Sequence, residues 1–228
     1  MRGDNVKIKA LWARVALPMA ACLLLAIAVA LAGCGGSGAT TTTSGAGSTG
    51  STAISTTVNT SAKTYYDDAN GYSFQYPASW TVREGSTADV SAGGTAVASV
   101  GVYDPKGTIV NSIAIDMAQI SVYKLNATVT DSMMSDVKVQ VQNVLSSLES
   151  QAGQIKTLEK LAETTVNGMK GFKVTYSLTK EKAPVVSTLY FLFSGKTEFQ
   201  VTVQAAEANW GADKVIFDSM LASFKPAA

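Results

Sequence analysis

The chain has 228 residues, of which 46% are hydrophobic and only 15% are charged, and its net charge at pH 7 is +1. It contains no histidine, which removes the usual general base at neutral pH and the commonest metal ligand. Four basic residues and one acidic residue give residues 1–14 a charge of +3, so the remaining chain carries +1 minus 3, or −2. A chain of this composition has no basic surface for nucleic acid, and we expect no nucleic-acid partner.

The N-terminal segment is typical of a secretory signal. Its basic residues precede an uncharged run, Val15–Ala32, dominated by Ala, Leu, Val and Ile. Because a basic flank stays in the cytoplasm, the chain after this run is expected to be exported. The run ends in Leu31, Ala32, Gly33 and Cys34.

These four residues resemble the lipobox of bacterial lipoproteins, an aliphatic residue followed by two small residues and a cysteine. The resemblance implies a signal peptide over residues 1–33, cleavage between Gly33 and Cys34, and lipidation of Cys34 with fatty acyl chains such as palmitate. The expected location is the outer face of the cell membrane, with the lipid as the membrane contact. Two alternatives remain: an uncleaved transmembrane anchor, since about 17–25 apolar residues span a bilayer, and a Cys22–Cys34 disulfide.

Residues 34–63 are predicted to be a flexible tether. They are nearly all Gly, Ser, Thr and Ala, and so they cannot bury enough apolar surface to offset the entropy of an ordered chain. A linker of this composition and length reaches about 30 Å.

Residues 64–228 are predicted to form one globular domain built on strands. Period-two alternation of apolar and polar residues indicates the strands, and Asn167-Gly168 is a strong hairpin signal. The expected strands are Tyr72–Tyr76, one beginning at Trp80 and Val82, Ala96–Tyr103, Ile113–Tyr123, Ile155–Val166, Phe172–Leu178, Leu189–Phe193 and Phe199–Ala205. Leu189, Phe191 and Phe193 alternate with Tyr190 and Leu192, so this strand is predicted to be covered on both faces.

Two amphipathic helices are expected. Apolar residues recur every three or four positions over Thr130–Ser150, with Thr130, Asp131 and Ser132 as candidate caps. In Ala208–Phe224, one stripe holds Trp210, Phe217, Leu221 and Phe224. Short turns between strands favour a mostly antiparallel sheet, and the two helices would cover it, giving an α+β fold.

The start of the domain resembles PsbP-like domains. Asn70–Pro77 followed by Ser79-Trp80 has the glycine, the aromatic–polar–aromatic strand, the Tyr-Pro pair and the Trp of that family. The resemblance implies an α/β/α sandwich around a mostly antiparallel sheet. It also implies a protein that binds other proteins rather than one that catalyses a reaction.

Several residue groups are candidate sites. Asp67 and Asp68 with Asp104 or Asp116 suggest calcium ligands, although they lack ligand spacing and fit turn residues better. Lys170, Lys173 or Lys196 could activate a serine, but no serine-lysine signature is present. The helical stripe, or Tyr65, Tyr66 and Tyr72, could face a partner; for the stripe, core packing is favoured.

We therefore expect a lipid-anchored, extracytoplasmic, non-catalytic interaction module that binds another envelope protein, with no cofactor and no metal. The alternative is a carrier that holds a small apolar ligand between the sheet and a helix. A core cavity above about 300 Å³ would favour the carrier, and a filled core with an exposed apolar patch would favour the module.

Overall fold

The computed structural model describes residues 61–85, 96–152, 155–180 and 182–226. The predicted signal peptide, the lipobox residues Leu31–Cys34 and the tether up to residue 60 lie outside these residues. The first described strand begins at Ala62, two residues before the predicted start of the domain at Thr64.

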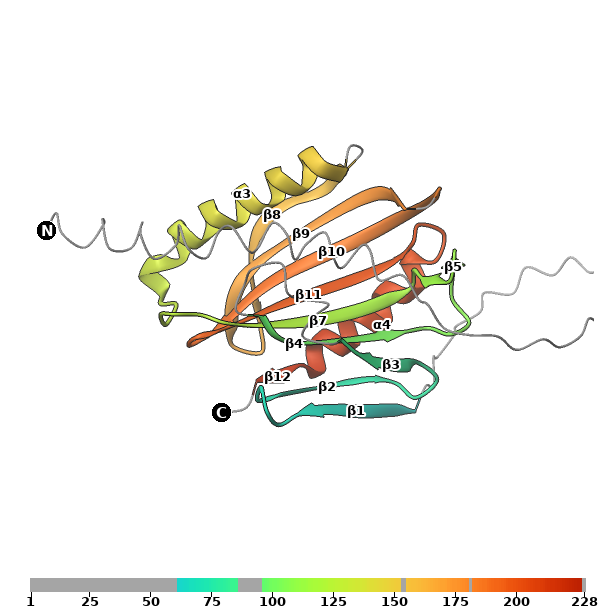
Figure 1. The fold of residues 1–228 in the computed structure, drawn as a ribbon, viewed down its shortest axis with the longest axis horizontal. Coiled ribbons are helices and arrows are strands. Elements are labelled where there is room, and N and C mark those ends of the chain that lie inside the picture. The colour runs from blue at the N-terminus through green and yellow to red at the C-terminus, as the bar shows by residue number, and fades with distance from the viewer. Residues whose placement is uncertain (1–60, 86–95, 153–154, 181, 227–228) are drawn as a thin grey trace, which may run out of the picture.

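Seven strands of the described residues form one sheet in which every neighbouring pair is antiparallel (Figure 1). In order across the sheet they are β3 (Thr81–Glu84), β4 (Ala96–Tyr103), β7 (Met117–Lys124), β11 (Thr197–Ala206), β10 (Ala183–Ser194), β9 (Met169–Lys180) and β8 (Lys156–Val166). The prediction of a mostly antiparallel sheet is confirmed.

Smaller sheets flank the large one within the described residues. The first has three antiparallel strands, β1 (Ala62–Asp67), β2 (Tyr72–Pro77) and the short β12 (Lys225–Pro226), in the order β1-β2-β12. We call it the small sheet. The second is the hairpin of β5 (Ile109–Val110) and β6 (Ile113–Ala114).

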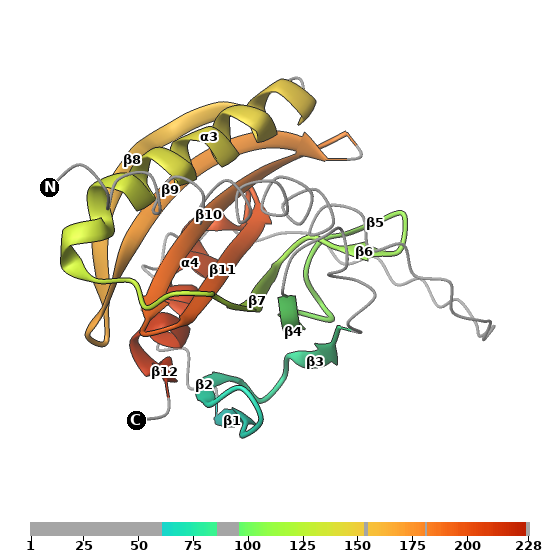
Figure 2. The same cartoon turned by 60° about the vertical axis from the view of Figure 1, so that its left-hand side comes forward.

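Helices cover both faces of the large sheet (Figure 2). A 3-10 turn, η2 (Asp131–Met133), leads into α3 (Met134–Ala152), and α4 (Trp210–Ser223) follows β11. The predicted cap Thr130 occupies the N-cap position of η2, but its side chain makes no capping hydrogen bond. α4 begins two residues after and ends one residue before its predicted range, Ala208–Phe224. α3 begins four residues after the predicted Thr130, because η2 precedes it, and ends two residues after Ser150.

Alternating side chains of β10 show that the helices lie on opposite faces. Leu189, Phe191 and Phe193 pack in one buried cluster with four residues of α3. Leu192 belongs to the other cluster, with α4 and the small sheet. The prediction that this strand is covered on both sides is confirmed, and the layers form the expected α/β/α arrangement.

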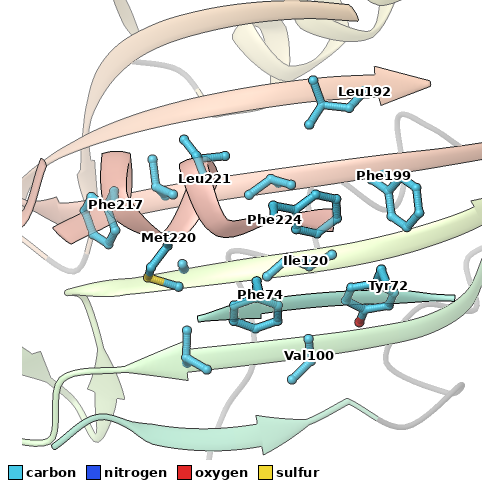
Figure 3. Close-up of a cluster of buried hydrophobic side chains, with 14 of the residues drawn as sticks. Tyr72, Phe74, Val100, Ile120, Leu192, Phe199, Phe217, Met220, Leu221 and Phe224 are labelled. Carbon is cyan, nitrogen blue, oxygen red and sulfur yellow. The ribbon is translucent and has the colours of Figure 1, made fainter. Parts of the chain in front are cut away.

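The core beneath α4 is aromatic and filled (Figure 3). The ring centroids of Phe199 and Phe224 lie 5.2 Å apart, and those of Trp80 and Phe217 lie 5.9 Å apart. Phe217, Leu221 and Phe224 are buried, and Trp210 packs beside them. The α4 stripe therefore belongs to the core, which is the alternative that the sequence favoured over a partner-docking surface. A pocket between α4 and the sheet, lined by residues that include Ile120, Met220 and Phe224, has a volume of only about 10 Å³, room for about one water molecule.

The prediction of one continuous strand over Ile113–Tyr123 is wrong. The chain leaves the small hairpin at Ala114 and enters the large sheet at Met117. Between them, the buried Asp116 carboxylate accepts hydrogen bonds from the backbone N–H groups of Thr108 and Ala206, each at 2.7 Å. Because a buried carboxylate requires hydrogen-bond donors, these contacts keep the chain out of strand geometry between Ala114 and Met117.

The predicted hairpin at Asn167-Gly168 is confirmed. Both residues have positive φ, 47° and 84°, as a type I′ turn requires. The Asn167 side-chain amide also donates to the carbonyl oxygens of Leu221 at 3.2 Å and Ala222 at 3.1 Å, and to that of Phe224. The β8–β9 turn therefore closes the C-terminal end of α4.

Candidate binding surface

An open groove runs between the outer face of the small sheet and the last turns of α4. Its volume is about 450 Å³, within the range of roughly 300–1,000 Å³ typical of ligand sites. We call it the outer groove. It is lined by Thr64, Tyr66, Ser73, Gln75, Ser219, Ala222, Ser223 and Lys225.

The alternation of β2 creates one wall of the outer groove. Tyr72 and Phe74 point into the core, so Ser73 and Gln75 point outward. The Gln75 backbone N–H donates to Ser223 Oγ at 2.8 Å, and Ser223 Oγ donates to the Met220 carbonyl at 2.7 Å. These bonds fix the end of α4 against β2 and set the width of the groove.

The groove combines polar walls with exposed apolar groups at its margins. Tyr66 is 68% exposed on β1, and Val215, one helical turn before Ser219 on α4, is 66% exposed. Hydroxyl, amide and ammonium groups between them can donate and accept hydrogen bonds. Of the eight described residues that line the groove, none carries a carboxylate, thiol or imidazole.

The three candidate tyrosines do not share one exposed face: the ring centroids of Tyr65 and Tyr72 lie 6.1 Å apart, and Tyr66 points the other way. Tyr72 is buried, and its ring stacks on that of Phe224 with centroids 5.7 Å apart. Tyr65 is half-buried beside Phe74. Only Tyr66 of the three faces the outer groove. Alternation along β1 explains the split, because residues 65 and 66 point to opposite faces.

Three of the four acidic candidates for calcium binding, Asp67, Asp104 and Asp116, accept hydrogen bonds from nearby groups, and Asp68 is exposed in the β1–β2 turn. The Asp67 carboxylate accepts from the backbone and side chain of Asn70 and shapes the β1–β2 turn. Asp104 accepts from the backbone of Lys106 at 2.9 Å. Across the described residues, no group of three or more His, Cys, Asp or Glu side chains could hold a metal ion.

Asp116 differs from the solvated turn residue that the sequence favoured. Its carboxylate is buried and also accepts from the Asn209 side-chain amide at 2.8 Å, which ties the start of α4 to the β5–β6 hairpin. Burial, followed by the nearby Asp116 and Asp104 charges, raises the pKa of Asp213 to about 6. The hydrogen bonds of Asp116 therefore connect the segment before β5, the end of β11 and the residue before α4.

The candidate lysines lie on the surface of the large sheet. Lys170 pairs with Asp131, and Lys173 Nζ lies 3.7 Å from a carboxylate oxygen of Glu159. Lys196 is in the exposed turn after β10. Two of the three are therefore placed beside carboxylates rather than beside a serine.

A buried carboxyl group on β11 was not predicted. Glu198 is fully buried; one of its oxygens accepts from the Gln200 side chain at 2.9 Å, and the other has no partner among the described residues. Burial raises the pKa of Glu198 to about 7, and the Gln200 hydrogen bond opposes this shift. The alternation of β11 indicated only that Glu198 and Gln200 share a face.

None of the helices in the described part of the chain is long and apolar enough to cross a membrane.

Residues 60–226 match the family model described as PsbP. The solution structure of cyanobacterial PsbP (CyanoP) from Synechocystis sp. PCC 6803 is similar to this chain, with 18% identity, a TM-score of 0.50, and coverage of 79% of this chain and 98% of that one. LpqN of Mycobacterium tuberculosis, whose structure is described as involved in cell envelope biogenesis, has 9% identity, a TM-score of 0.50, and coverage of 75% and 92%. None of the curated proteins compared with the chain matches it.

Proposed function

Because the chain belongs to the PsbP family, whose model it matches over residues 60–226, we propose that it is a non-catalytic binding module of the cell envelope. In this proposal, cleavage after Gly33 leaves a lipid on Cys34, the tether lifts the domain from the outer face of the membrane, and the outer groove contacts another envelope protein. The description of LpqN as an envelope-biogenesis protein is consistent with this location.

The outer groove is the observation that carries the proposal. It combines the exposed Tyr66 ring with hydrogen-bonding walls, and the exposed Val215 lies one helical turn before the lining residue Ser219. Tyrosine is enriched at protein interfaces because its ring buries apolar area while its hydroxyl group keeps a hydrogen-bond partner. β1 also follows directly on the predicted tether, so the groove lies near the point where the domain is anchored.

The carrier alternative needs a cavity between the sheet and a helix. The pocket between α4 and the large sheet has a volume of about 10 Å³, far below the roughly 300 Å³ that a small ligand requires. On the other face, Val137, Val141, Val144 and Leu148 of α3 pack directly on buried side chains of β9 and β10. The packing therefore supports the binding module.

Position-specific photo-crosslinking of the full chain in its native membrane tests the proposal. A photoreactive residue at Gln75, in the groove, should capture one envelope protein. The same residue at Val139, which is 50% exposed on α3 on the opposite side of the sheet, should not. Adding Tyr66→Ser should reduce the Gln75 product severalfold. Identical products from both positions, or none from Gln75, would refute binding through the groove.

A further inference from the structure

The edge strands of the two larger sheets differ in how well they are protected against pairing with a strand of another chain. β3 has only four residues. β8 is long, but its pairing with β9 shifts register twice, and Lys156, Glu159, Lys160 and Glu163 place charges along it. Short length, bulges and charges are the usual devices that stop an edge strand from pairing with another chain.

β1 has fewer of these devices. Its six residues pair with β2 in one unbroken register, and they include no proline. Residues 62, 63, 64 and 66 are exposed, and β1 lies at the rim of the domain in both views (Figures 1 and 2). The edge of β1 is therefore suited to accept another strand.

The register shows which backbone groups of β1 point outward. The Ala78 N–H donates to the Ser61 carbonyl at 2.8 Å, and hydrogen-bonded pairs alternate along an antiparallel ladder. Lys63, Tyr65 and Asp67 therefore bond to β2, while the backbone groups of Ala62, Thr64 and Tyr66 point to the free edge. The Gln75 N–H, opposite Thr64, points away from β1 and donates to Ser223 Oγ. This is the direction that the alternation of hydrogen-bonded and non-hydrogen-bonded pairs requires.

The side chains of β1 are self-complementary in one antiparallel register. If two copies pair about a two-fold axis at Tyr65, each Thr64 lies opposite Tyr66 of the other copy. Each Lys63 lies opposite Asp67 of the other copy, which gives two pairs of opposite charge. Neither residue forms an ion pair with another described residue. A register centred on Thr64 places Lys63 opposite Tyr65 and gives no such pair.

This register also satisfies the geometry of the ladder. Thr64 and Tyr66 both direct their backbone groups outward, so they form the hydrogen-bonded pairs. Tyr65 then lies opposite its own copy, and Lys63 opposite Asp67, in the closer non-hydrogen-bonded positions, with Cα atoms about 4.5 Å apart.

We propose that two copies of this chain associate through antiparallel pairing of their β1 strands, centred on Tyr65. The two small sheets then form one sheet in the order β12-β2-β1-β1-β2-β12. Since Thr64 and Tyr66 line the outer groove, the two grooves meet at the symmetry axis. The proposal does not depend on an envelope partner, because it uses only groups of this chain.

The pairing is compatible with anchoring of both copies in one membrane. Antiparallel strands of six residues begin about 20 Å apart, at roughly 3.4 Å per residue. Each predicted tether reaches about 30 Å, so both can end in the same bilayer.

Disulfide crosslinking in the membrane tests the register. Full-length Lys63→Cys and Asp67→Cys chains with different tags are expressed together and oxidised. We expect a disulfide-linked product that carries both tags, because the paired Cα atoms fall within the roughly 4.4–6.8 Å that a disulfide spans. Each variant expressed alone should give no more product than the parent chain, whose Cys22 and Cys34 set the background. No mixed product, or equal product from either variant alone, would overturn the proposal.

Because Asp67→Cys also removes the turn contact with Asn70, a second comparison tests whether the crosslink comes from strand pairing. Thr64→Pro, added to both tagged chains, removes an outward N–H that the isolated domain does not need, and proline is tolerated at such edge positions. It should lower the mixed product about tenfold, since it removes two intermolecular hydrogen bonds from each dimer. Thr64→Ala retains the N–H and should leave the yield unchanged. A yield that is insensitive to Thr64→Pro would show that the crosslink does not come from strand pairing.

Discussion

Asn167 shapes a turn and closes a helix with the same side chain. Its positive φ suits the β8–β9 hairpin, and its amide donates to carbonyl oxygens at the end of α4. The last carbonyl groups of a helix lack the usual partner four residues on and carry the negative end of its dipole. The Leu221 carbonyl also accepts from the backbone N–H of Phe224 at 3.1 Å. A donor at this position therefore stabilises both elements.

Replacing Asn167 separates these roles. Asn167→Gly keeps the positive φ and loses only the capping bonds, so it should lower the free energy of unfolding by about 1 kcal/mol. Asn167→Asp replaces the donor by a carboxylate facing carbonyl oxygens and should cost about 2 kcal/mol or more. Urea unfolding followed by circular dichroism measures both. An Asp variant as stable as the Gly variant would contradict the capping role.

Glu198 makes stability depend on pH. Its pKa is about 7 in the folded chain against an ordinary 4.5, so the native state binds the proton more tightly. The corresponding stabilisation is complete below about pH 4.5 and is lost as the pH rises through 7. Glu198→Gln keeps an acceptor for Gln200 and removes the charge. At pH 8 it should be more stable than the parent by about 1–3 kcal/mol, with little difference at pH 4. Parallel unfolding curves at the two pH values test this; an equal effect at both would exclude the buried charge as the cause.

At the scale of elements, β9 and β10 approach each other closely at Gly171. A Cβ atom there would overlap the Phe191 carbonyl oxygen, which belongs to the backbone and cannot rotate away. Gly171→Ala should therefore displace β10 and destabilise the domain by about 2–4 kcal/mol. Gly211→Ala in α4 is the matched control, because nothing lies within 4 Å of its Cβ position. A similar midpoint of thermal unfolding for both variants would show that the strands adjust freely.

The elements that sequence reasoning found are those with a long periodic pattern. β11 alternates apolar and polar residues over Phe199–Ala205, β10 contains the apolar run Leu189–Phe193, and α4 repeats its apolar stripe from Trp210 to Leu221. The elements it missed are β1, the β5–β6 hairpin and β12, which are short or set by distant partners. β12, for example, has two residues and exists because Lys225 pairs with Ser73, far away in the chain. The break before β7 depends in the same way on Asp116 meeting the N–H of Ala206.

At the scale of the whole molecule, the candidate site is created by packing. Thr64 and Tyr66 come from the first described strand, and Ser219 and Ser223 from the last helix. Nothing in the local sequence of either segment indicates that they face each other, so the outer groove could not be predicted. The filled core could be anticipated, because the aromatic residues on β2 and α4 lie at positions with core spacing.

The arrangement of the whole chain also gives a test of anchoring. The N-terminal segment has two cysteines, and only Cys34 stands at the end of the lipobox pattern, while Cys22 lies in the apolar run of the leader. If a lipid on Cys34 holds the domain at the membrane, Cys34→Ser should abolish incorporation of labelled palmitate and leave a precursor of unprocessed length. Cys22→Ser is the matched control, since it removes the other thiol and should change neither result. More than one acyl chain is needed for stable anchoring, at about 0.8 kcal/mol for each buried methylene. The processed parent should therefore stay with the membrane through a high-salt wash. Label in the Cys34→Ser chain, or its loss in Cys22→Ser, would refute lipidation at Cys34.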